Sequence, residues 1–137
     1  MYHFSTMLDG SFESAIDRVV SALQHHGMGV LTEIDAQAAF QKKLGKSFRR
    51  YTILGACHPQ IAFEMLAEDD KAGTLYPCNI VVQEHEPGRV EVSAIDPRMM
   101  FLMVPTPQAK AIAIRASEVI QAVMFEVASP QAAAALS

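Results

Sequence analysis

The chain has 137 residues and a formal net charge of −4; half of its residues are hydrophobic and 19% are charged. This length predicts one domain, and a chain of this size removes roughly two-thirds of its unfolded surface from water. The composition excludes an intrinsically disordered chain. It also argues against a nucleic-acid partner, because the basic residues form only one small cluster: Lys42, Lys43, Lys46, Arg49 and Arg50.

The N-terminal stretch MYHFSTMLDGSF lacks the charged and apolar regions of a signal peptide. No apolar run approaches the roughly 18 residues that a membrane span needs. Two cysteines, Cys57 and Cys78, without an export signal indicate a reducing compartment, in which a structural disulfide is not expected. We therefore expect a cytoplasmic protein with no membrane partner.

Strands and helices alternate in the first half of the chain. Strands are predicted at residues 2–7, 29–34 and 51–56, where β-branched and other apolar residues recur. A helix over residues 11–26 can begin at Ser11 and end at Gly27, and a shorter helix over 36–44 can begin at Asp35 and end at Gly45. Strand–helix–strand order of this kind is typical of a layered α+β domain.

The second half starts with a helix at Pro59, where the missing N–H has no consequence, and His58 stands at its cap. The predicted buried stripe of this helix is Ile61, Ala62, Met65 and Leu66. Strands follow at residues 75–83 and 89–95, a short helical segment at 96–103, and the longest helix at 108–128. The remaining residues, 129–137, are expected to form a loose tail.

The strand pair 75–83 and 89–95 admits two registers. A strict two-residue turn pairs Val82 with Ser93, whereas a shift by one residue aligns Val82 with Val92 and Ile80 with Ala94. The shifted register places apolar residues on one face of both strands, and a slip of one residue reverses every side chain. We therefore predict the shifted register.

The shifted register needs an extra residue, so a bulge is expected near His85 or Gly88. It also places Cys78 opposite Asp96 at the end of the hairpin away from the turn. Side chains at opposed positions lie about 4.5–5.5 Å apart at Cβ, so a carboxylate would stand beside the thiol and raise its pKa.

Four segments of the chain resemble one family. They are GMGVLTEID (27–35), GACHP (55–59), LYPCNIVV (75–82) and VSAIDP (92–97). In order and in kind they are similar to the domain-of-unknown-function 302 family, and the resemblance extends over residues 2–123. It implies a single curved antiparallel sheet of about five strands covered by helices, usually in a dimer. It implies no established activity; some relatives are encoded near sulfur-oxidation genes.

Together these observations predict an α+β fold over residues 1–128, with one antiparallel sheet and a long C-terminal helix. Cys57 is the candidate nucleophile, because the free N–H groups and dipole of the helix behind it can lower a thiol pKa. The alternative is a small apolar residue that fills the end of a strand. Cys78, in the middle of a strand, is expected to be packed and less reactive than Cys57.

The candidate binding residues are His58, Cys78, Asn79 and Asp96. We expect any pocket to lie at the end of the hairpin away from its turn, bounded by Cys57, His58, Asn79 and Asp96. The alternative is that Asn79 and Asp96 only satisfy backbone groups, and that Asp96 caps the segment that begins at Pro97.

No cofactor or metal is expected. Cys57 and Cys78 do not have redox Cys-x-x-Cys spacing, and a zinc site would need two more ligands. Methionine thioethers can bind copper(I), but Met99, Met100 and Met103 are more typical of a core or an interface.

Two hypotheses for function follow. The first is a non-enzymatic dimeric binding or accessory protein, since catalytic motifs are absent and the last helix is rich in small apolar residues. A small-molecule or protein partner is possible under it. The second is a thiol-dependent sulfur carrier or redox partner that acts through Cys57, with Cys78 as a resolving thiol. The thiol pKa distinguishes the two.

Overall fold

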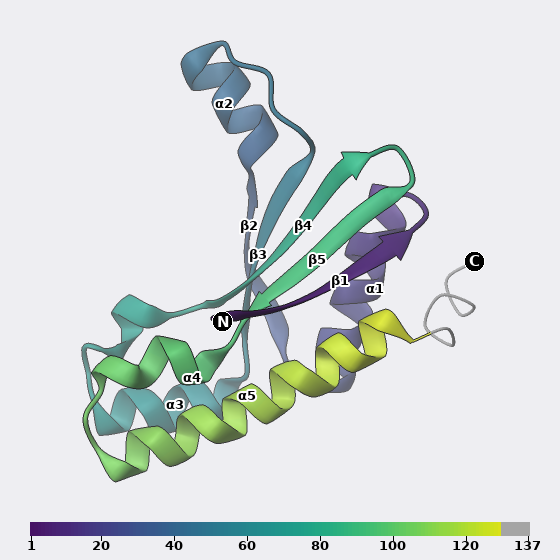
Figure 1. The fold of residues 1–137 in the computed structure, drawn as a ribbon. Coiled ribbons are helices and arrows are strands. Elements are labelled where there is room, and N and C mark those ends of the chain that lie inside the picture. The colour runs from purple at the N-terminus through teal and green to yellow at the C-terminus, as the bar shows by residue number, and fades with distance from the viewer. Residues whose placement is uncertain (130–137) are drawn as a thin grey trace.

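The computed structural model describes residues 1–129, and the predicted tail, apart from Ser129, lies outside the described residues. Figure 1 shows the arrangement. The elements are β1 (His3–Asp9), α1 (Phe12–His25), β2 (Gly29–Asp35), α2 (Ala36–Leu44), β3 (Tyr51–Cys57), α3 (Pro59–Glu68), the 3-10 turn η1 (Ala72–Leu75), β4 (Cys78–Glu86), β5 (Arg89–Ile95), α4 (Pro97–Met100), the 3-10 turn η2 (Phe101–Met103) and α5 (Pro107–Ala128).

The five strands form one open sheet in the order β1-β5-β4-β3-β2, and every neighbouring pair is antiparallel. Strands β1 and β2 are therefore the two edges. Helices α1 and α5 share one hydrophobic core with the central strands. The predicted α+β class, the sheet and the long last helix are confirmed.

Local capping explains where the first helices begin and end. The Ser11 hydroxyl accepts a hydrogen bond from the Ser14 N–H at 3.0 Å, and the Asp35 carboxylate accepts one from the Ala38 N–H at 2.9 Å. Each satisfies an N–H that has no partner within the helix. Gly45 ends α2 with φ of 63°, a left-handed conformation that favours glycine. These predicted boundaries are confirmed.

The β4–β5 hairpin has the predicted shifted register. Ile80 pairs with Ala94 and Val82 pairs with Val92, and the ladder is irregular between Glu84 and Glu86. The bulge predicted near His85 is thereby confirmed. Strand β4 starts at Cys78 and not at Leu75, because Leu75 belongs to η1.

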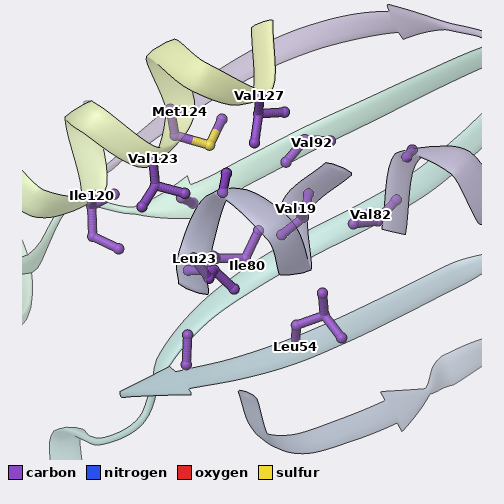
Figure 2. Packing of buried hydrophobic residues seen from close by; sticks show 14 of the residues in the cluster. Val19, Leu23, Leu54, Ile80, Val82, Val92, Ile120, Val123, Met124 and Val127 are labelled. Atoms are coloured by element: carbon purple, nitrogen blue, oxygen red, sulfur yellow. The ribbon is translucent and has the colours of Figure 1, made fainter. Parts of the chain in front are cut away.

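The main core lies between α1, α5 and the inner face of the sheet. Figure 2 shows side chains from α1 and α5 converging on those of β3, β4 and β5. The fully buried members of the main core include Val19, Leu23, Leu54, Ile80, Val82, Val92, Ile120, Val123 and Val127. Burying a side chain of this size stabilises the fold by about 1.5–3 kcal/mol before the entropy loss is counted.

A second core joins α3 to the first half of α5. Ile61 and Met65 of α3 pack with residues of α5, as the stripe predicted for this helix requires. Ala62 is half-buried, and Leu66 is exposed. The prediction that Leu66 is buried is wrong, because only part of the apolar face of α3, at Ile61 and Met65, packs against the rest of the chain.

The segment from β2 to the start of β3, residues 29–50, is separate from both cores, and we call it the arm. Every residue of β2 is exposed, and Ala36 is the buried residue of α2. Figure 1 shows α2 standing away from the other helices, at the far end of the molecule from α3 and α4. Among the described residues, no helix is both long enough and apolar enough to cross a membrane.

Candidate functional site

The junction of β3 and α3 holds the two residues that the sequence singles out, Cys57 and His58. Strand β3 extends to Cys57, one residue beyond the predicted range. His58 is the cap and Pro59 is the first helical residue, as predicted. The Nδ1 atom of His58 accepts a hydrogen bond from the Ile61 N–H at 3.4 Å. An Nδ1 that accepts must be unprotonated, so the cap is formed by the neutral imidazole.

The environment of Cys57 does not favour a thiolate. The residue is half-buried and forms no disulfide. Burial raises the pKa of its thiol above the ordinary value. This direction of the Cys57 pKa is opposite to the lowering predicted from the helix start, because burial disfavours the charged thiolate.

Cys78 is buried as the first residue of β4, and its Cα pairs with that of Ala56. Its Sγ lies 3.9 Å from Sδ of Met100. Burial, with a smaller contribution from Cys57, raises the pKa of the Cys78 thiol to about 12. The predicted rise of the Cys78 pKa is right, but its predicted cause, a carboxylate beside the thiol, is wrong.

The Asp96 carboxylate is directed to Arg98 and not to Cys78. The Oδ2 atom of Asp96 lies 2.7 Å from Nη2 of Arg98, and Oδ1 accepts from the Arg98 backbone N–H at 3.0 Å. Burial alone would raise the pKa of Asp96, but the hydrogen bonds from Arg98 and Ser117 outweigh it and lower the pKa. Asp96 thus caps the helix that starts at Pro97, which was the alternative prediction for this residue.

The predicted pocket is divided between two faces of the sheet. His58 and Cys78 line a small cavity with Met28, Ile61, Tyr76 and residues of α5. Its volume is about 10 Å³, counted as the space open to the centre of a water molecule, so it has room for roughly one water. Asn79 lies on the opposite face, as its place in the strand predicts, and lines a separate hollow with Tyr76 and Ile95.

Gly55 is a structural residue of this region that sequence analysis missed. A methyl group at this position would overlap the Thr32 side chain and the Pro77 ring. The glycine therefore lets β2 and the chain before β4 approach β3 closely. Glycine inside a predicted strand was the available signal, since it weakens a strand unless a neighbour needs the space.

No metal centre is evident in residues 1–129. Within that range, no group of three or more His, Cys, Asp or Glu side chains lies close enough to hold an ion. The three methionines considered for copper(I) also diverge: Met100 packs inward, whereas Met99 and Met103 are exposed.

A larger groove lies where α4 and η2 meet the start of α5, and its volume is about 810 Å³. This is within the roughly 300–1,000 Å³ of small-molecule sites. Sequence analysis did not predict this groove, because its shape depends on how the segment before α5 packs against that helix. It is lined by Arg98, Leu102, Val104, Pro105, Thr106, Pro107, Lys110, Ala113 and Ile114.

Comparisons with known proteins agree with this fold and assign no activity to it. A family model described as "Domain of unknown function DUF302" matches residues 4–127. A crystal structure of an uncharacterized conserved protein DUF302 from Bacillus stearothermophilus is 28% identical and superimposes with a TM-score of 0.84. The match covers 93% of this chain and 98% of the other. The search of curated proteins finds no match.

Proposed function

Since the chain belongs to the DUF302 family, whose description assigns no activity, we propose a function from its surfaces: it is a non-enzymatic binding protein that acts as a homodimer in the cytosol. The free thiols of Cys57 and Cys78 support the cytosolic part of this proposal. The observation that carries the proposal is the exposed apolar surface of the arm.

The arm exposes more apolar surface than its own fold can use. Leu31 and Leu44 are 67% and 62% exposed, and Ile34 is 50% exposed. Phe40 and Phe48 pack edge to face with centroids 5.2 Å apart, yet both remain more than a third exposed. Large exposed apolar patches mark interaction sites in soluble proteins.

The backbone of the arm is also open to a partner. Strand β2 is an edge of the sheet and, among the described strands, pairs with β3 alone. An exposed apolar edge strand is a template for pairing with another strand, and natural proteins cover or blunt such edges. We propose that β2 pairs antiparallel with β2 of a second copy.

The arm carries charges of both signs, so part of its surface can complement a second copy of itself. Acidic Glu33 and Asp35 lie in β2, whereas the five bases lie in or after α2: Lys42, Lys43, Lys46, Arg49 and Arg50. A two-fold contact applies the same surface to itself, so the basic part of each arm can face the acidic part of the other.

Helix α5 supports the dimer less than its sequence suggests. Its apolar residues are largely used inside the chain: Ala109, Ile112, Ala113, Ala116, Ile120, Val123, Met124 and Val127 are buried. Ile114 and Phe125 are the large apolar residues that it exposes. The arm therefore exposes more apolar surface to a second copy than α5 does.

The thiol hypothesis gains no support from this geometry, because burial raises the pKa of both cysteines. We expect slow alkylation of native Cys57 at pH 7.5 and slower alkylation of Cys78, which is 4% exposed. Mass mapping after brief iodoacetamide treatment measures both rates. A Cys57 pKa clearly below 7, from the pH dependence of its rate, would restore the sulfur-carrier hypothesis; faster labelling of Cys78 would overturn the ranking.

Sedimentation velocity at micromolar concentration tests the dimer. The wild-type chain should sediment with twice its mass of 15.0 kDa. Leu31→Asp should give the monomer mass, because it places a charge in the proposed contact. Leu102→Asp is the matched control, since Leu102 is 69% exposed and Leu31 is 67% exposed. A monomeric wild type, or a dimer that survives Leu31→Asp and is lost in Leu102→Asp, rejects the arm as the interface.

A further inference from the structure

The groove at the start of α5 has apolar walls and a buried floor. Val104 and Ala113 are buried beneath it, whereas Leu102 and Ile114 stand beside it with much of their surface exposed. Such a groove can bury an apolar chain. Its volume of about 810 Å³ far exceeds that of the cavity beside Cys78, which has room for about one water.

The charged residues that line the groove are both cations, Arg98 and Lys110. Asp96 takes two nitrogens of Arg98, Nε and Nη2. The guanidinium is still half-exposed, and its Nη1 has no protein partner among the described residues. Lys110 makes no ion pair within residues 1–129. The groove therefore offers donors to an anion at one side of an apolar surface.

A second copy of the chain is a poorer occupant of this groove. A two-fold contact centred on it would bring Arg98 and Lys110 of one copy close to the same cations of the other, and like charges in an interface are unfavourable. The arm, which carries both signs, lies at the other end of the molecule (Figure 1). The charges therefore indicate different partners: a second copy of the chain for the arm, and an anion for the groove.

We propose that this groove binds an amphipathic anion, an apolar chain that ends in a carboxylate or a phosphate. Lys110 and the free side of the Arg98 guanidinium bind the head group. The apolar chain lies along Leu102, Val104 and Ile114. The start of α5 adds little to the site, because the Thr106 hydroxyl already accepts the Ala109 N–H at 3.1 Å.

Isothermal titration of the full chain with dodecanoate, below its micelle concentration, tests the proposal. The wild type should bind one dodecanoate per chain and should bind the uncharged dodecyl maltoside at least about tenfold more weakly. Lys110→Glu should weaken dodecanoate binding by at least about tenfold, which is the scale of one charged contact. Arg89→Glu makes the same change of net charge at the hairpin turn and should leave binding unchanged. Dodecyl phosphate, titrated in parallel, shows which head group is preferred.

Any of these binding results would overturn the proposal: no saturable binding of either anion, equal binding of dodecyl maltoside, or equal weakening by Lys110→Glu and Arg89→Glu. Ile114→Asp should weaken binding and leave the sedimenting mass unchanged. A change of mass without a change of binding would make this face a chain–chain contact and would also reject the site. Leu31→Asp should bind dodecanoate as the wild type does, so failure of the dimer and failure of the site are separate outcomes.

Discussion

The two edges of the sheet are strands of equal length with opposite surroundings. Strand β1 pairs with β5 at all seven positions, and its Leu8 and Phe4 pack against the main core. Strand β2 pairs with β3 across a bulge, and all seven of its residues are exposed. An edge strand can thus be stabilised by its own chain or left for a partner, and the cover over its side chains shows which applies.

The largest expected effect is a difference in stability between two leucine variants, one on each edge strand. Leu8→Ala in β1 should lower the free energy of unfolding by about 2–4 kcal/mol, because it leaves a cavity in a packed core. Leu31→Ala in β2 should change the stability of the monomer by no more than about 0.5 kcal/mol, since the side chain is exposed. Urea unfolding at a concentration that dissociates the dimer measures both. Equal losses would show that β2 is covered within the chain.

Gly55→Ala tests how the arm is attached. The added methyl overlaps Thr32 of β2 and Pro77, so we expect a loss of about 1–3 kcal/mol from overpacking. Gly29→Ala is the control, because a methyl there meets no atom within 4 Å. Urea unfolding compares the two variants. A Gly55→Ala protein as stable as Gly29→Ala would mean that β2 and Pro77 can move away from β3 at little cost.

A smaller effect, of up to about 1 kcal/mol, is expected when acid protonates the Asp96 carboxylate, because its ion-pair partner is partly exposed. Asp96 lies beside the chain just before β1, where its backbone N–H donates to the Tyr2 carbonyl at 2.8 Å. The folded-state pKa of Asp96 is lowered, mainly because Arg98 outweighs burial. Its contribution is therefore complete above the unfolded pKa of about 3.9 and is lost as pH falls through the lower folded value. Arg98 is half-exposed, which limits the size of the effect.

The Asp96→Asn variant provides the test. The stability of the wild type relative to this variant should be constant between pH 5 and 7 and should decrease below about pH 4. Thermal unfolding at a series of pH values measures this difference. A difference that stays constant down to pH 2.5 would mean that the Asp96–Arg98 pair does not stabilise the fold.

The sequence predicted the features that depend on neighbouring residues. Caps at Ser11, Asp35 and His58 and the register of the β4–β5 hairpin follow from local hydrogen bonding and from alternation on one face. Those predictions needed no knowledge of distant contacts, and the structure confirms them.

The predictions that were wrong depended on contacts that the sequence does not fix. Asp96 directly follows β5, but its carboxylate turns to Arg98, two residues away, which offers a bidentate partner. Cys57 lies at a helix start, yet its partial burial raises its pKa. The groove beside Lys110 was missed because its walls come from a loop and a helix whose packing sets its shape.

Amide hydrogen exchange of the two edge strands tests most directly whether β2 is covered by a second copy. At a concentration where the dimer is predicted, the N–H groups of β2 that point away from β3 should be protected, and those of β1 that point away from β5 should exchange rapidly. In Leu31→Asp the same β2 groups should exchange as rapidly as those of β1. Rapid exchange of the outward β2 amides in the wild-type chain would contradict the account, whatever mass the protein shows.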